Sequence, residues 1–368
     1  MKLRPEAMNN YDKQHLLNLQ RYLAKIDASY KAAIKEGVNI SGTIKHVKDD
    51  GIFSFDDYPI THKRINELLQ QLKDNLQVCI VNGVRSEWTL ANNKNNELAN
   101  RVFGKNKSKL TPQQERRYYS NNDAARIAFE QRKENGLDLS QRVWEYSKQF
   151  KQELELGLDV GIRNGRSADE MSRDIRQYLK QPDKLFRRVR DEHGNLKLSQ
   201  AAKAYHPGQG VYRSSYKNAR RLTSTETNIA YRTADHLRYQ QLDFVVGIEV
   251  HLSGNHTLNG KKFHDICDEL QGKYPKDFKF TGWHPQCRCY ATSILKTPEE
   301  IAEDNRRLLR GEPVSDDSVN AVRDVPPAFT QWLADNEERL QKASSVPNFM
   351  SDNPQYTGIQ LRYGAVGA

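Results

Sequence analysis

The segment between residues 264 and 289 holds the residue types best suited to chemistry. His264 and Cys267 form a His-x-x-Cys pair, and a loop separates them from Cys287 and Cys289. Thiolate and imidazole are the ligands that Zn²⁺ prefers, and two ligand pairs joined by a loop suit its tetrahedral coordination. This pattern predicts a zinc site, and four protein ligands would make the site structural because no position stays open for water.

The identity of the four ligands is ambiguous in the sequence. Cys287 and Cys289 are two residues apart in an expected strand, so both would point to one face and both could bind. His284 and Cys287 alternatively repeat the His-x-x-Cys spacing. We expect His264, Cys267, Cys287 and Cys289 as ligands, with His284 as the alternative. Without a metal, the thiols would be small buried hydrophobic groups and the histidines would be hydrogen-bonded.

Positive charge is concentrated between residues 182 and 221, which contain ten lysines and arginines against three acidic residues. This segment supplies a net +7 of the chain's +10, and tyrosines are interleaved with the cations. Cations that reach phosphates beside rings that stack on bases are typical of a nucleic-acid-binding face. A solvated basic hairpin would have the same composition. The candidate contacts are Arg187, Arg188, Arg190, Lys197, Arg213 and Lys217.

Long amphipathic helices are expected in the N-terminal region, 1–110. The first has an apolar stripe with alternating spacings of three and four, and Gly37 is a plausible stop. The second begins near Thr61 and runs past Cys79, a structural thiol, toward Trp88. A helical region, 111–180, follows, with good helix starts at Thr111 and Ser167. The first stripe comprises Leu16, Leu19, Leu23, Ile26, Tyr30 and Ala33.

The next region, 181–297, is expected to be a small α+β core. It contains a hairpin turning near residues 193–195, a helix over about 214–242, an alternating strand over 246–252 and a second strand over 287–295. The C-terminal region, 298–368, predicts a helix after Pro298, a last one after Pro327, and a mobile tail after about residue 350. The fold class is therefore mainly α with a small α+β core.

Glu226 lies in the middle of the apolar face of the helix expected over 214–242. A buried carboxylate needs a partner, because an isolated charge in the interior is too costly. Arg288, between two of the cysteines, is the candidate for a structural ion pair with Glu226. The alternative is a partly exposed Glu226 at the edge of the stripe.

Three sequence features together resemble the phage Mu F-like minor head proteins. These are the run RLTSTETNIAYR (221–232), the GKYP turn (272–275) with HPQCRC (284–289), and the upstream helix GRSADEMSRDIRQYL (165–179). The resemblance covers about residues 160–295. His264 departs from it, because many relatives carry a cysteine there.

The resemblance implies a virion structural protein and not an enzyme. Such proteins are present in a few copies near the portal, on the inner side of the head, after assembly in the host cytoplasm. The implied partners are the portal protein, the major capsid protein and packaged double-stranded DNA. No apolar run is long enough for a membrane span, and the N-terminus lacks the apolar core of a secretory signal.

The alternative function is a metal-dependent nuclease of the His-Asn-His kind. His251, His256, Asn259 and His264 are close in sequence, and in such enzymes a histidine activates water while a divalent ion holds the scissile phosphate. Their spacing is too short for the helix that normally separates the ligands in a ββα metal finger. About seventy residues after Leu295 are also too few for an appended catalytic domain.

Overall fold

A computed structural model describes residues 8–44, 47, 53–182, 188–198, 203, 212–253, 257–258, 261–315, 317–343 and 346–358. The chain divides into two compact units, each discontinuous in sequence. Unit 1 comprises residues 1–19, 84–129 and 225–368, and unit 2 comprises 20–83 and 130–224. The units are not the four consecutive regions expected from the sequence, because three long helices each contribute residues to both.

These three helices are α1 (Asn10–Ser41), α2 (Pro59–Phe103) and α8 (Ser215–Gln241). The apolar periodicity predicted all three, but the stop at Gly37 is wrong, since α1 continues to Ser41. A Cβ atom at Gly37 would lie 3.0 Å from Cδ1 of Leu154, so this glycine allows close packing within unit 2. Glycine here meets a packing requirement and does not end the helix.

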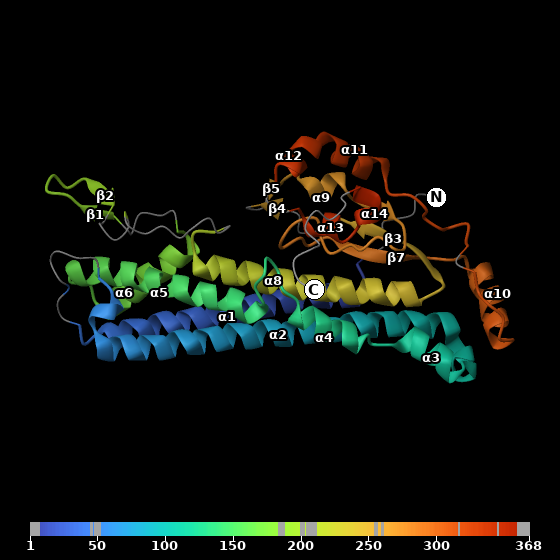
Figure 1. Cartoon of the computed structure of the whole chain (residues 1–368), viewed down its shortest axis with the longest axis horizontal. Coiled ribbons are helices and arrows are strands. Elements are labelled where there is room, and N and C mark those ends of the chain that lie inside the picture. The colour runs from blue at the N-terminus through green and yellow to red at the C-terminus, as the bar shows by residue number, and fades with distance from the viewer. Residues whose placement is uncertain are drawn as a thin grey trace. The chain divides into compact units, whose positions relative to one another are not determined.

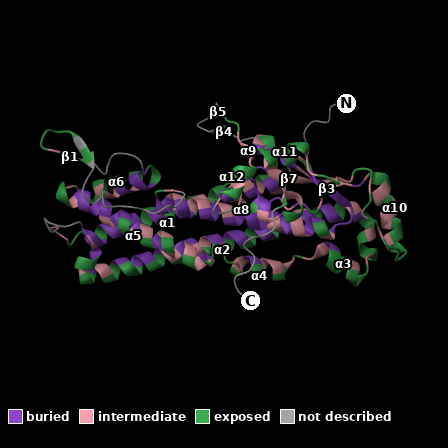
Figure 2. Ribbon diagram, turned by 45° about the horizontal axis from the view of Figure 1, so that its top comes forward, coloured by how far each residue is buried: buried purple, intermediate pink, exposed green. Residues whose placement is uncertain are grey.

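Unit 2 also contains α5 (Leu139–Arg163) and α6 (Ala168–Lys180), which pack against each other through two glycines. A Cβ at Gly157 would be 2.4 Å from Ile175, and one at Gly161 would be 2.4 Å from Met171. The N-terminal half of α5 alternates buried and exposed positions, whereas residues 156–161 are all buried (Figure 2). The predicted capping box of Ser167 is present, and the predicted hairpin pairs β1 (Arg188–Arg190) with β2 (Leu196–Leu198).

Unit 1 is built around a three-stranded antiparallel sheet in the order β6–β3–β7. Strand β3 (Val245–His251) lies between β6 (Gly272–Tyr274) and β7 (Tyr290–Leu295). In Figure 1 the sheet lies between α8 and a group of short helices: α9 (Ile266–Glu269), α11 (Pro327–Asp335), α12 (Glu337–Gln341), α13 (Asn348–Ser351) and α14 (Pro354–Thr357).

The core of unit 1 is aromatic. Trp283 packs edge-on against Phe349 at 5.2 Å between ring centroids, and Tyr274 packs against Phe329 at 5.8 Å. The remaining elements are short: α3 (Pro112–Tyr119), α4 (Asp123–Gln131), α10 (Pro298–Leu309), β4 (Thr257–Leu258), β5 (Lys261–Lys262) and two 3₁₀ helices, η1 (Phe55–Asp57) and η2 (Gly104–Lys109). Within the described part of the chain, no helix combines the length and apolar character that crossing a membrane requires.

Three expectations for unit 1 are corrected. Strand β7 begins at Tyr290, so Cys287 and Cys289 lie in the loop before it. The sheet has a third strand, β6, and α11 is followed by three more short helices. The expected tail after about residue 350 is wrong for residues 351–357, because α14 lies there and Asn353 is fully buried, with hydrogen bonds to the backbone of Lys279.

Candidate metal centre and its supporting network

Three cysteines of unit 1 form a buried group that could hold a metal ion. Cys267, in α9, has its Sγ 3.8 Å from Sγ of Cys287, and Cys289 belongs to the same group. All three are free thiols with at most 3% exposure. The sequence prediction that Cys267 lies beside Cys287 and Cys289 is confirmed.

His284 is placed beside this group. Its Nε2 lies 3.1 Å from Cys267 Sγ, and its Nδ1 lies 2.8 Å from the carbonyl oxygen of Pro285. The carbonyl can only accept, so Nδ1 carries the proton and the lone pair of Nε2 faces the sulfur. Asp265, the N-cap of α9, has Oδ2 3.5 Å from the same Nε2. Asp265, Cys267 and His284 thus form a second candidate ligand group.

His264, the first choice from the sequence, lies elsewhere. Its side chain is 71% exposed, with Nδ1 3.9 Å from Oε1 of Glu269. It belongs to neither ligand group found among the described residues. The capping of α9 explains this position, because Asp265 turns inward to accept from the Cys267 amide and His264 precedes the turn. The alternative ligand, His284, is the histidine beside the cysteines.

The pKa values of Cys267 and Cys287 are shifted in opposite directions. Hydrogen bonds from Cys267 and Cys289 hold the pKa of Cys287 well below its usual range. The hydrogen bond between Cys267 and Cys287 raises the pKa of the Cys267 thiol. This direction favours deprotonation at Cys287 over Cys267, and the thiolate is the form that binds metals.

Two side chains of α8 hold the loop that carries these cysteines. Asn228 Nδ2 donates to the carbonyl oxygen of Cys287 at 2.6 Å. Arg232, one turn later, donates to the carbonyl oxygens of Thr281 (2.8 Å), Cys287 (2.8 Å) and Cys289 (2.6 Å). A Cβ on Gly282 would lie 2.2 Å from Arg232 Nη1, and this glycine has φ of +109°. Glycine is therefore required where the loop passes the guanidinium.

A chain of buried polar groups continues behind Asn228. Its Oδ1 lies 2.7 Å from His15 Nε2, and His15 Nδ1 lies 2.5 Å from Oε2 of Glu87. Because Asn228 Nδ2 donates to Cys287, its oxygen accepts from His15. A proton therefore sits on Nε2, and the contact with Glu87 needs a second proton between Nδ1 and the carboxylate. This series of hydrogen bonds connects α2, α1 and α8 to the cysteine loop.

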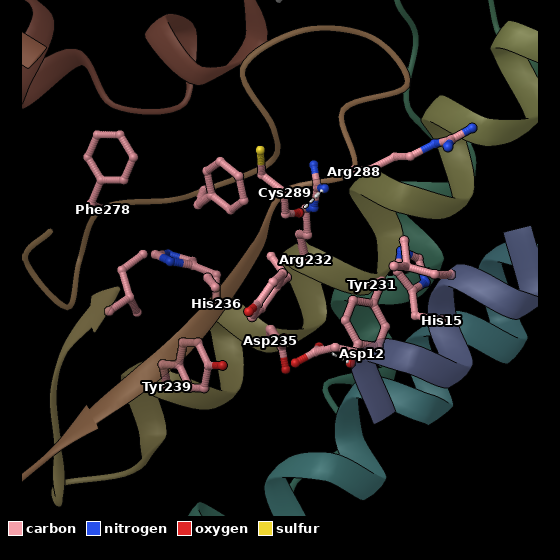
Figure 3. Close-up of a pocket in the computed structure, with 15 residues that line it drawn as sticks. Asp12, His15, Tyr231, Arg232, Asp235, His236, Tyr239, Phe278, Arg288 and Cys289 are labelled. Atoms are coloured by element: carbon pink, nitrogen blue, oxygen red, sulfur yellow. Dashed lines mark hydrogen bonds between the residues drawn. The ribbon is translucent and has the colours of Figure 1, made fainter. Parts of the chain in front are cut away.

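A buried lysine joins the same three helices nearby. Lys94 Nζ lies 3.0 Å from Oδ1 of Asp12 and 2.7 Å from Oδ2 of Asp235. Burial opposes the charge of Lys94, but the two carboxylates hold its pKa well above the usual value. Tyr231 stacks on His15 with ring centroids 4.2 Å apart and donates to Asp12. Figure 3 shows Asp12, His15, Tyr231 and Asp235 with Arg232 and Cys289 around a cavity of about 30 Å³.

The sequence reasoning missed His15, Asp12, Glu87 and Lys94. A signal existed in α1, because the buried positions Leu19, Tyr22 and Ile26 continue backwards with the same spacing to His15 and Asp12. A polar residue at a stripe position indicates a buried polar network when a partner is available. The partners come from α2 and α8, which the sequence alone does not place.

The proposed ion pair between Glu226 and Arg288 stays a prediction. Glu226 is buried, with 2% exposure, as its stripe position indicated. Arg288 is exposed, since it alternates with the two buried cysteines.

The candidate nucleic-acid residues are placed only in part. Arg187 lies outside the described residues. Arg190 and Lys197 are exposed on the hairpin, where Lys197 pairs with Val189 and so lies on the opposite face from Arg190. Arg213 is exposed, and Lys217 lies 5.7 Å from the ring centroid of Tyr212. Strand β1 also contains Arg188.

Two of the four residues of the nuclease hypothesis, His256 and Asn259, lie outside the described part of the chain. His251 Nε2 bonds to Oγ1 of Thr292 at 2.9 Å, and its ring stacks on Tyr290. Among the described residues, neither His251 nor His264 belongs to a candidate metal group. Cys79 is partly buried, and burial raises its pKa, which suits a structural thiol.

Comparison with known proteins identifies no relative. The chain matches no protein-family model, no curated protein and no solved structure.

We predict that Arg232→Lys exposes the cysteines to thiol reagents. An ammonium keeps the charge but cannot reach three carbonyl groups in a fork. Labelling of Cys287 and Cys289 by a disulfide reagent should be at least about tenfold faster, which corresponds to roughly 1.4 kcal/mol of local opening. The matched control is Arg288→Lys, an exposed arginine in the same loop. Equal labelling rates in the two variants would contradict the role of Arg232.

We also predict a pH dependence of stability from His236, which lines the same cavity. Burial, with a smaller effect of Lys279, lowers its pKa to about 4, against the opposing effects of Asp352 and Asp277. The unfolded chain binds this proton more tightly, so the contribution is complete above about pH 6.5 and is lost as pH falls toward 4. In urea unfolding, the loss should be at most about 1.4 kcal/mol per pH unit. His236→Gln should flatten the curve in this window, and an unchanged curve would contradict the assignment.

Proposed function

We propose that this chain is a structural minor head protein of a tailed bacteriophage, positioned near the portal inside the head. One observation carries the proposal: two of the three sequence features behind the resemblance, 221–232 and 284–289, meet through Asn228 and Arg232 of α8 and the carbonyl groups of Cys287 and Cys289. In this contact the side chains of Asn228 and Arg232 bind backbone carbonyl groups of the cysteine loop, a role that fits a structural protein. The partners in this proposal are the portal protein, the major capsid protein and packaged double-stranded DNA.

We propose zinc as the metal, held by Cys267, Cys287, Cys289 and His284. Zn–S bonds of about 2.3 Å at tetrahedral angles put two sulfur ligands about 3.8 Å apart. The distance between the sulfurs of Cys267 and Cys287 is 3.8 Å. The Pro285 carbonyl, which fixes the His284 tautomer, is the type of outer contact that orients metal-binding imidazoles. Four protein ligands make this a structural staple for the loop between α9 and β7.

The nuclease alternative has weaker support. A hydrolytic metal site needs an open coordination position and a base beside it. The three thiols are at most 3% exposed, so the protein encloses the cysteine group and leaves no open side for a water at a bound ion.

We predict that His284→Ala lowers zinc affinity by about 10- to 100-fold or more, since it removes a ligand. Zinc content of protein purified without added metal should be about one per chain, measured by elemental analysis. A competing chelator then gives the affinity of each variant. His264→Ala is the matched control and should behave as the wild type. A greater loss in His264→Ala than in His284→Ala would restore the ligand set expected from the sequence.

We predict that the chain co-purifies with the portal ring of its own phage when the two are co-expressed. The complex should elute at the size of the ring with a few copies bound, as mass photometry would show. The same preparation should leave plasmid DNA intact with Mg²⁺ or Mn²⁺. A chain that elutes alone and cuts plasmid would refute the structural role and support the nuclease.

A further inference from the structure

A second hollow, in unit 2, is lined by positive charge. Helix α1 contributes Lys31, and α6 contributes Arg176 and Lys180. The hollow has a volume of about 160 Å³. This is roughly ten times the 10–15 Å³ that one water needs, but below the roughly 300 Å³ of typical small-molecule sites. Its size therefore suits a small group such as a phosphate and excludes a whole nucleotide.

The acidic residue in this lining is already neutralised. Asp27 forms an ion pair with Arg220 of α8 and accepts a hydrogen bond from the hydroxyl of Tyr216 at 2.8 Å. Burial of Tyr216 and its hydrogen bond to Asp27 raise the pKa of this phenol to about 12, so it stays a donor at neutral pH. The carboxylate of Asp27 is therefore bound by Arg220 and Tyr216.

The three cations remain uncompensated. Within the described ranges, no carboxylate lies at ion-pair distance from Lys31, Arg176 or Lys180. Arg173, one turn before Arg176 along the outer face of α6, has by contrast Asp174 at 3.7 Å. Three like charges around one hollow repel one another, so a dianionic or monoanionic group bound between them would lower the free energy.

We propose that Lys31, Arg176 and Lys180 form a phosphate-binding pocket that takes a backbone phosphate of nucleic acid. Arginine and lysine are the side chains that contact phosphates, and here they extend from α1 and α6, with Lys31 and Lys180 exposed and Arg176 partly buried. The strongly basic segment of the sequence begins at Pro182, two residues after Lys180.

This inference deepens the DNA contact of the proposed function but does not depend on the portal. Its test uses the full purified chain and a labelled 20-base-pair duplex, with binding followed by fluorescence anisotropy between 50 and 200 mM NaCl. Each lost phosphate contact should reduce the slope of log K against log [salt] by about 0.9. The triple variant Lys31→Gln, Arg176→Gln, Lys180→Gln should lose about 2.7 units of slope and bind at least about tenfold more weakly.

The control triple variant is Lys25→Gln, Lys35→Gln, Arg173→Gln, which removes the same charge from exposed positions on the same two helices. Both variants are checked for unchanged helix content and melting temperature. An equal fall in the control, or no fall in the pocket variant, overturns the proposal.

A second arm distinguishes the source of the phosphate. Inorganic phosphate, added at constant ionic strength, should displace the duplex from the wild type more than chloride does, and this excess should vanish in the pocket variant. If inorganic phosphate raises the melting temperature of the wild type while duplex binding is the same in wild type and pocket variant, the pocket takes free phosphate, and the backbone assignment is wrong. Failure of portal co-purification would leave each of these readouts unchanged.

Discussion

The structure of unit 1 depends on the hydrogen bonds by which side chains of α8 bind the loop before β7. Asn228 and Arg232, one helical turn apart, donate to the carbonyl oxygens of Cys287 and Cys289. The loop has little regular structure of its own, so these bonds set the direction of its backbone and hence the direction of the two thiols. Arg232 is buried, and its guanidinium also lies 4.9 Å from the ring centroid of Phe280. A buried cation with this many partners is satisfied in one loop geometry and costly in others.

The polar chain behind Asn228 extends this constraint to α1 and α2. His15 joins Asn228 to Glu87, and Lys94 joins Asp12 to Asp235. Removing one member would leave a buried charge or polar atom without its partner, which costs more than the net gain of a typical hydrogen bond. The helices therefore meet in one register here, and the aromatic core around Trp283 fills the other side of the sheet. A metal bound by the cysteines would fasten a loop that these contacts already orient.

Much of the helical architecture could be predicted, because local physics determines it. The three-and-four spacing of apolar residues predicted α1 and α2, and the caps at Thr111 and Ser167 are capping boxes as expected. The errors arose where a partner far away in sequence decides. Gly37 lies within a helix because Leu154 packs against it, and Asn353, in the expected tail, is buried because it bonds to the backbone of Lys279. Strand β6, three residues long, is too short for a periodic signal and forms because β3 pairs with it.

Composition and spacing along the chain are enough to predict the helices, the basic segment and a cluster of thiol and imidazole groups. The position of His284, and not His264, beside Cys267 and the burial of His15 do not follow from the spacing of residues along the chain. Both outcomes follow from packing between elements. A cap turns the chain at Asp265 and leaves His264 in solvent. Glu87 and Asn228, distant in sequence, supply the two partners that allow an imidazole to be buried.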